Sequence, residues 1–307
     1  MVTLQTLSDL HSLAQEMGEK AVTQPHVENL LKAFGQLILM KQRWLQEREC
    51  QRVSVDIDKH RLNEGVPLIE HGGFFDTEDP WDEAALFAVA AIFQGFPEYG
   101  VEMSVLSEEI ENGRYKIDPL SITIQRASGV CVFTSERINE VNPIVVELFS
   151  RFLWRLILCS KRRDCESEMR HIVWSKGYCP VCGSYPQLAI LETHEEKMLC
   201  CSECGHQWRF SGPYCPYCEN EDKKRIRLLG IEGEGDGAAF ICMECRKYLI
   251  STGTSAMCRQ PNSDLLSLGF VHLDMILQGK GFMPMAECEW NVLYPDAHAD
   301  RTARDGS

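Results

Sequence analysis

The chain has 307 residues, which is enough for two domains at about 150 residues each. Hydrophobic residues make up 44% and charged residues 25%, a mixture that excludes disorder, collagen and coiled coil as descriptions of the whole chain. The formal net charge is −14, and the parts before and after Cys179 are both acidic. Because such a chain repels phosphate backbones and shows no concentrated basic face, we expect no nucleic-acid partner.

The sequence also carries signals about the compartment. Its opening residues, MVTLQTLSDL, lack the basic and apolar segments of a signal peptide. The longest apolar run, 84–93, is half of the roughly 20 residues that a bilayer-spanning helix needs, so we expect no membrane insertion. These features predict a cytoplasmic protein, in which thiols stay reduced and paired cysteines indicate metal or redox chemistry.

The residues before Cys179 have the pattern of a helical region. Apolar residues recur every three or four positions over 26–45, which predicts a helix that buries one face. A second helix is predicted to begin at 79–81 and to run through 84–93, and because it is apolar nearly all round we expect it to be central. Asn142 and Pro143 are expected to open a third helix over 144–158. Residues 114–134 are compatible with either a hairpin or a loop.

From Cys179 onward, short apolar runs alternate with cysteine pairs. A helix is predicted within the stretch 263–282, with Ser263 as its N-cap and Gly279 as its C-terminal stop. The polar stretch 295–307 is expected to be a mobile tail. The runs that we expect to form strands are 187–191, 197–201, 225–231, 238–243 and 247–251.

Eight of the fifteen cysteines form four C-x-x-C pairs. The two residues inside each pair allow one backbone turn, called a knuckle below, to aim both thiolates at one ion. Two knuckles together complete a tetrahedral shell of four sulfurs, which suits Zn²⁺ or a single iron. The pairs are Cys179/Cys182, Cys201/Cys204, Cys215/Cys218 and Cys242/Cys245.

Four pairs can be matched into two sites in three ways. Sequential matching leaves 18 residues between the pairs of the first site and 23 between those of the second. Each of these intervals contains two predicted strands that can form a hairpin. Interleaved matching would give a cross-braced arrangement instead. Because of the predicted strands, we favour the sequential arrangement.

The two expected sites differ in the residue that follows each knuckle. In the first site this residue is glycine, Gly183 and Gly205, which reaches positive φ without strain. In the second site it is Glu219 and Arg246, for which positive φ costs about 1–3 kcal/mol if it is required. We therefore predict that the second site is more open or more easily stripped of metal.

Other candidate ligands fit less well. Cys200 would make a C-x-x-x-C turn unlike the others, and Cys258 lies beyond the fourth pair, where a buried thiol is more typical. His206 is expected to be exposed or packed beside its knuckle, and His272 to lie in the core or an interface. The basic run 223–227 is expected to be a solvated strand edge.

The sequence shows no arrangement typical of a catalytic centre. It has no G-x-S-x-G, Walker, G-x-G-x-x-G or H-E-x-x-H motif. A di-iron peroxidase needs paired Glu-x-x-His motifs, and one match exists, from Glu168 to His171. A thioredoxin-like oxidoreductase needs one C-x-x-C pair beside a βαβ unit. We therefore expect no catalytic residue.

The cysteine pairs lie in the segments 178–191, 199–210, 215–220 and 241–250, and these have specific flanks. Gly183, Ser184 and Pro186 follow the first knuckle, Trp208 follows the second, and Lys-Tyr-Leu at 247–249 follows the fourth. In order, spacing and flanks they resemble the formate dehydrogenase accessory protein FdhE family, and so does the helix that ends near residue 282. The Ser-Gly-Pro link at 211–213 is a departure, because the family often has an arginine before the third knuckle.

The resemblance implies an α+β, multidomain fold. The expected parts are a helical domain (1–175), two small rubredoxin-like, zinc-ribbon metal modules (176–212 and 213–260), and a C-terminal helix with a polar tail (261–307). One ion would be held by Cys179, Cys182, Cys201 and Cys204 and the other by Cys215, Cys218, Cys242 and Cys245. The expected metal is iron, although such shells accept zinc readily.

The resemblance also implies a function. It points to a cytoplasmic maturation factor, not an enzyme, that binds the catalytic subunit of formate dehydrogenase and is needed for its activation before export. The alternative is a rubredoxin-like electron carrier that acts directly in redox transfer. The sequence is compatible with a homo-oligomer.

Overall fold

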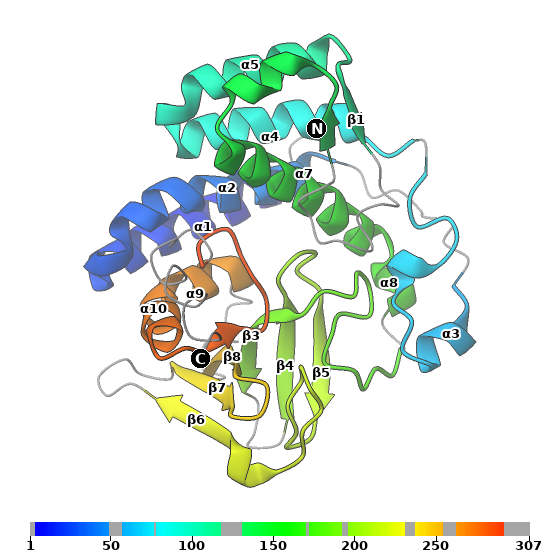
Figure 1. Ribbon diagram of the computed structural model, residues 1–307, viewed down its shortest axis with the longest axis vertical. Helices are drawn as coiled ribbons and strands as arrows, with labels where there is room; N and C mark the ends of the chain where they lie inside the picture. The colour runs from blue at the N-terminus through cyan, green and yellow to red at the C-terminus, as the bar shows by residue number, and fades with distance from the viewer. Residues whose placement is uncertain are drawn as a thin grey trace, which may run out of the picture. The chain divides into compact units, whose positions relative to one another are not determined.

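The computed structural model describes residues 4–48, 57–76, 78–117, 131–169, 172–191, 196–230, 237–253 and 262–291. Contacts divide the chain into two compact units, Met1–Val173 with Pro180–Gly183, and Trp174–Cys179 with Ser184–Ser307. The first unit is helical and the second is built on a β-sheet, as Figure 1 shows, in agreement with the α+β fold expected from the sequence. The finer division into four parts given above stays a prediction.

The helical unit is organised around α4, which packs against α2, α5 and α7. Ala84, Ala85 and Ala88 of α4 are fully buried, and their small side chains let the neighbouring helices approach closely. The helix is central, as expected, although Phe93 on its outer face is 50% exposed. The helices are α1 (Leu4–Thr23), α2 (Glu28–Glu47), α3 (Lys59–Asn63), α4 (Trp81–Gly95), α5 (Gly100–Glu111), α7 (Pro143–Asp164) and α8 (Glu166–Met169).

Local signals in the sequence explain where these helices begin. The side chain of Asn142 accepts a hydrogen bond from the Ile144 amide at 3.0 Å and so caps α7, as predicted. A short 3₁₀ turn, Pro25–Val27, precedes α2, which covers most of the helix predicted for 26–45. None of the helices in the described ranges is long and apolar enough to cross a bilayer.

The segment that was compatible with a hairpin or a loop contains a short hairpin. Strands β1 (Tyr115–Ile117) and β2 (Cys131–Phe133) pair antiparallel, with Tyr115 opposite Phe133. The intervening stretch 118–130 lies outside the described residues, and so does the predicted tail at 295–307.

The second unit contains one continuous sheet with the order β5-β4-β3-β8-β7-β6, and β9 pairs with β8. The hairpins predicted inside each metal module are present, as β3–β4 and β6–β7. A parallel pairing of β3 with β8, which sets Leu188 opposite Ile250, joins the two modules into this sheet. The strands are β3 (Pro186–Leu191), β4 (Glu196–Cys201), β5 (Gln207–Ser211), β6 (Ile226–Gly230), β7 (Ala238–Cys242), β8 (Lys247–Gly253) and β9 (Met283–Pro284).

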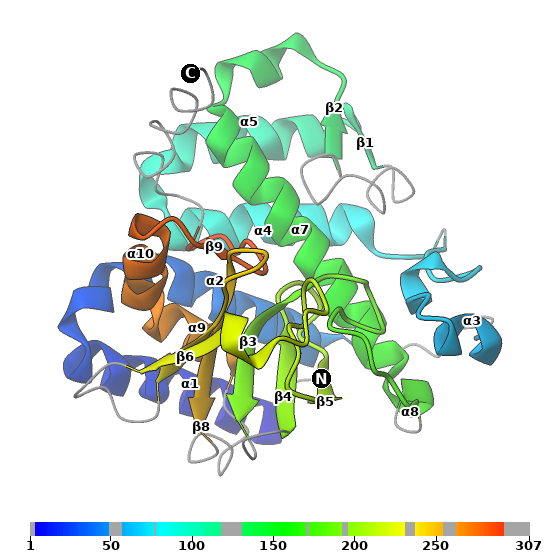
Figure 2. The ribbon, with the colours of Figure 1, turned by 60° about the horizontal axis from the view of Figure 1, so that its bottom comes forward.

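The helix predicted for 263–282 is in fact two helices, α9 (Ser263–Gly269) and α10 (Val271–Gly279), which meet at Phe270. The expected cap was off by one residue, because Asn262 and not Ser263 accepts hydrogen bonds from the first amides of α9. The break lets Phe270 join Leu273 and Leu277 in one apolar cluster with the sheet residues. Figure 2 shows both helices lying beside the sheet.

Candidate metal centres

The structure brings the cysteines of the four pairs into two groups. Within each group the four sulfur atoms all lie within 4.8 Å of one another. In the first group Cys179 Sγ lies 3.5 Å from Cys204 Sγ, and in the second group Cys215 Sγ lies 3.8 Å from Cys245 Sγ and Cys218 Sγ lies 3.7 Å from Cys242 Sγ. The grouping is sequential, as the strand pattern favours: Cys179, Cys182, Cys201 and Cys204 form the first site, and Cys215, Cys218, Cys242 and Cys245 the second.

These separations fit a tetrahedral metal shell. With metal–sulfur bonds of about 2.3 Å, neighbouring sulfurs of a tetrahedron lie about 3.8 Å apart. None of these eight cysteines is joined in a disulfide. A shell of four thiolates suits zinc or a single iron and leaves no open coordination position. Each group can therefore hold one metal ion, which gives two ions per chain.

The backbone turns of the knuckles explain how the sulfurs come together. In three knuckles, the amide of the first cysteine donates to the carbonyl five residues later. These bonds are Cys179–Ser184 at 2.9 Å, Cys201–His206 at 2.9 Å and Cys215–Asn220 at 3.0 Å. At the first site Gly183 and Gly205 leave the turn with φ of +74° and +69°. A Cβ at Gly205 would meet nothing within 4 Å, so only backbone conformation requires glycine there.

At the second site the same conformation is imposed on larger residues. Glu219 and Arg246 have φ of 58° and 56°, and they are the non-glycine residues with positive φ in the described part of the chain. Each such residue costs about 1–3 kcal/mol, which the surrounding turn must offset. Cys218 is exposed and Cys245 half-buried, whereas all four cysteines of the first site are buried. The second site is thus the more open one, as the sequence predicts, and its easier loss of metal stays a prediction.

Backbone amides inside the knuckles are directed at sulfur. The Glu203 amide lies 3.4 Å from Cys201 Sγ. Burial acts to raise the pKa of the Cys242 thiol, but the amides of Glu244 and Cys245 donate to its sulfur, and the net effect is a lowered pKa. Such donors stabilise the thiolate, which is the form that binds metal.

Of the weaker cysteine and histidine candidates, Cys200, His206 and His272 lie outside both groups. Cys200 is buried in the apolar cluster of the sheet, where burial raises the pKa of its thiol to about 12. His206 stacks on Trp208 with ring centroids 6.4 Å apart. His272 of α10 is half-buried, and its ring lies 6.3 Å from that of Phe270, the residue before the helix. Cys258 and His171 lie outside the described residues.

The basic run 223–227 is a solvated strand edge, as expected. Lys223, Lys224 and Arg225 form an exposed 3₁₀ turn, and Arg227 is exposed on β6, the last strand of the sheet. Arg225 pairs with Glu244 at 2.9 Å, so part of the positive charge is already matched within the chain.

Sequence reasoning missed what holds the tip of the first knuckle. The amides of Leu68 and Ile69 donate to the carbonyls of Pro180 and Val181 at 2.9 and 2.8 Å. These bonds explain why Pro180–Gly183 is grouped with the helical unit. A backbone pairing between segments so distant in the chain leaves no pattern in side-chain type, so no signal could have revealed it.

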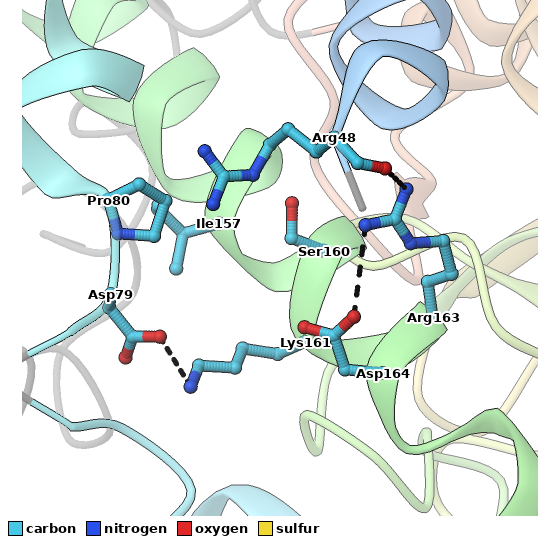
Figure 3. A pocket seen from close by; sticks show the side chains of 8 residues that line it. All are labelled: Arg48, Asp79, Pro80, Ile157, Ser160, Lys161, Arg163 and Asp164. Carbon is cyan, nitrogen blue, oxygen red and sulfur yellow. Dashed lines mark hydrogen bonds and ion pairs between the residues drawn. The ribbon is translucent and has the colours of Figure 1, made fainter. Parts of the chain in front are cut away.

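A polar cluster in the helical unit was also missed, and Figure 3 shows it around a small pocket. Lys161 of α7 forms a buried ion pair with Asp79, which precedes α4, and also lies 3.4 Å from Asp76. Burial raises the pKa of Asp79, against the lowering effect of Lys161. Arg163 donates to the carbonyl of Arg48 at 3.0 Å. These bonds tie the end of α7 to the end of α2 and the start of α4, which is a structural role.

Comparison with known proteins points in one direction. No family model matches the chain. A curated protein from Aquifex aeolicus (strain VF5), "Protein FdhE homolog", is 28% identical over 38% of this chain and 42% of its own length. A second "Protein FdhE homolog", from Pseudomonas aeruginosa, is 29% identical over 24% of this chain and 27% of its own length. The chain thus spans less than half the length of the curated relatives it matches.

The fold has a counterpart among solved structures. The crystal structure of the FdhE protein from Pseudomonas aeruginosa matches with a TM-score of 0.60 and 18% identity, over 91% of this chain and 93% of that chain. Fold and site define a class of protein: a helical unit followed by a sheet that carries two tetra-cysteine groups. In fold the chain is similar to the solved FdhE protein, and in sequence it is similar to the two curated FdhE homologues.

Proposed function

We propose that the chain is an accessory protein for the maturation of formate dehydrogenase. In this role it acts in the cytoplasm, binds the catalytic subunit of that enzyme before export, and is not itself a catalyst. The observation that carries the proposal is the pair of tetra-cysteine groups, which have the order and flanks of the FdhE family. The relatives' names support the family, and the client and the compartment are what the proposal adds.

The metal would be iron or zinc, held by the eight cysteines named above. When bound, it supplies a rigid cross-link or a one-electron couple, because a closed shell has no position for substrate or water. The chain's own residues set the geometry. Trp208 donates through Nε1 to the carbonyl of Lys176 at 3.1 Å, and this bond fixes the approach of the chain to the first knuckle.

Co-purification with formate dehydrogenase subunits tests this proposal. We expect the wild-type chain to retain the catalytic subunit, and Cys182→Ser and Cys218→Ser to bind one metal ion fewer and to retain less of it. Cys200→Ala is the matched control, because it removes a buried thiol next to a ligand but outside both groups. Retention of no subunit by metal-loaded wild-type protein would contradict the accessory role.

A second candidate function, electron transfer, is favoured by the exposure of Cys218 at the second site. An absorption spectrum of anaerobically purified protein separates the two functions. Iron–thiolate bands that bleach on reduction and return on oxidation would support an electron carrier. A colourless zinc protein that still binds the catalytic subunit would support the accessory role with structural metal.

A further inference from the structure

The knuckle that holds Cys215 and Cys218 rests directly on the segment that leads into the first site. A Cβ added to Gly177 would lie 1.8 Å from the carbonyl oxygen of Pro216, so the two backbones touch and only glycine fits. On either side of this contact, Tyr214 donates to the carbonyl of Ser175 at 3.2 Å, and Lys176 lies 3.7 Å from Glu219. The approach to Cys179 and the third knuckle therefore share one interface.

Tyr185 makes a second connection between the sites. Its carbonyl accepts a hydrogen bond at 3.3 Å from Ser202, the residue after Cys201 in the first site. Its ring packs on Tyr217, inside the third knuckle, with centroids 4.6 Å apart. Its ring also lies 6.4 Å from that of Tyr178, the residue before Cys179. One half-buried tyrosine thus contacts both halves of the first site and the centre of a knuckle of the second.

The knuckle on which these contacts converge is one of the two that end in a non-glycine residue at positive φ. Glu219 is held at φ 58°, and its amide donates to the Cys215 carbonyl at 2.9 Å. Strained conformations persist only where the surroundings enforce them. Gly177 and Tyr185 are part of those surroundings, and metal in the first site fixes both, because each is anchored beside a first-site cysteine.

We propose that Gly177 and Tyr185 are positioning residues through which the first site organises the second. Metal bound at the first site holds them against Pro216 and Tyr217, and this support favours the metal-binding conformation of the third knuckle. Metal affinity at the second site therefore depends on occupancy of the first. The inference rests on the metal-binding part of the proposed function and is independent of the client.

Metal titration of the whole chain tests this coupling. Co²⁺ and Zn²⁺ are the probes, with Co²⁺–thiolate absorption reporting sulfur coordination. In wild-type protein the weaker binding step reports the second site with the first site filled. In the double variant Cys182→Ser, Cys204→Ser the first site is absent. We expect the second site of this variant to bind about 5- to 150-fold more weakly, the usual range for coupled sites.

Substitutions at Tyr185 identify the connection. We expect Tyr185→Leu, introduced into both backgrounds, to reduce the coupling factor itself, a change that general destabilisation would not produce. Tyr185→Phe keeps the ring and the backbone carbonyl and should preserve the coupling. Tyr115→Leu, at a half-buried tyrosine of the helical unit, is the matched control and should leave the factor unchanged. Gly177→Ala should weaken the second site through its clash with Pro216.

The outcomes separate this inference from the proposed function. Equal second-site affinity with and without the first site would overturn the coupling and leave the accessory role standing. A coupling factor unchanged by Tyr185→Leu would remove Tyr185 from the connection. If wild-type protein bound no Co²⁺ or Zn²⁺, the coupling and the metal-dependent function would both fail.

Discussion

The two metal sites use the same C-x-x-C turn under different backbone conditions. At the first site the chain leaves each knuckle through a glycine, Gly183 or Gly205, and all four cysteines are buried. The second forces Glu219 and Arg246 into the same positive φ and leaves Cys218 exposed. A shared ligand motif therefore does not imply equal metal retention, because the residue after each knuckle decides how much strain the bound ion must offset.

Graded chelation should show the largest effect of this difference between the two sites. With two strained residues at about 1–3 kcal/mol each, we expect the second site to lose its metal at least about tenfold more readily than the first. Metal content of the wild-type protein is measured during stepwise addition of a chelator. The Cys218→Ser variant, which lacks a ligand of the second site, identifies which of the two ions is released first. Loss of the first-site ion first, or simultaneous loss of both, would contradict the comparison.

Gly205→Ala should move the first site toward the behaviour of the second. No neighbouring atom obstructs the new methyl group, so the change isolates the backbone cost of about 1–3 kcal/mol at positive φ. We expect faster metal release from the first site and a lower Tm. Gly279→Ala, at the end of α10 where a Cβ would also meet nothing within 4 Å, is the control and should have little effect.

Glu219→Gly should make the second site retain its metal more like the first site does. It removes a positive-φ cost at the second site, at the expense of an exposed ion pair with Lys176, and exposed pairs contribute little. We expect tighter metal binding by about 1 kcal/mol, or roughly fivefold. Glu219→Gln, which loses the charge but keeps the side chain, should not reproduce the gain.

Asp274→Asn tests whether part of the pH dependence of the sheet unit is separate from the thiols. Burial raises the pKa of Asp274 from 3.8 to about 7, against the lowering effect of the hydrogen bond from Tyr248 at 2.6 Å. The folded protein thus holds this proton more tightly than the unfolded chain, so the contribution of Asp274 to stability is fullest below pH 3.8 and declines as the pH rises to about 7.

The Asn variant should therefore gain stability relative to wild type as the pH rises from 5 to 8. Each kcal/mol gained in the free energy of unfolding should raise Tm by about 2–4 °C. Thermal unfolding of metal-loaded protein at both pH values measures this difference. Tyr248→Phe, which removes the hydrogen bond but leaves the carboxyl buried, should lower Tm at pH 8 instead. An identical pH trend for wild type and Asp274→Asn would contradict the assignment.

Sequence alone predicted the parts of this molecule that depend on short-range chemistry. The four knuckles, the glycines that follow two of them, the cap at Asn142 and the β3–β4 and β6–β7 hairpins all arise from residues close together in the chain. The missed strand β5 has Trp208 and Phe210 buried in alternation, a signal that was present but short.

The remaining features depend on contacts between distant segments. The break between α9 and α10 places Phe270 in the apolar cluster of the sheet, and the helical spacing of apolar residues does not predict such a break. The parallel register of Leu188 with Ile250 and the backbone bonds from Leu68 and Ile69 likewise follow from tertiary packing. The predicted strands between the cysteine pairs indicated which sulfurs would meet, but not that the backbones of the two sites would touch at Gly177.

The pairing of β3 with β8 limits how this protein can be taken apart. Neither cysteine-rich half can be expressed alone without exposing a bare strand edge with Leu188 or Ile250 beside it. Uncovered apolar edges recruit other chains. A fragment that carries a single metal ribbon should therefore self-associate, and transplanting one ribbon into another scaffold would require a substitute strand for that edge.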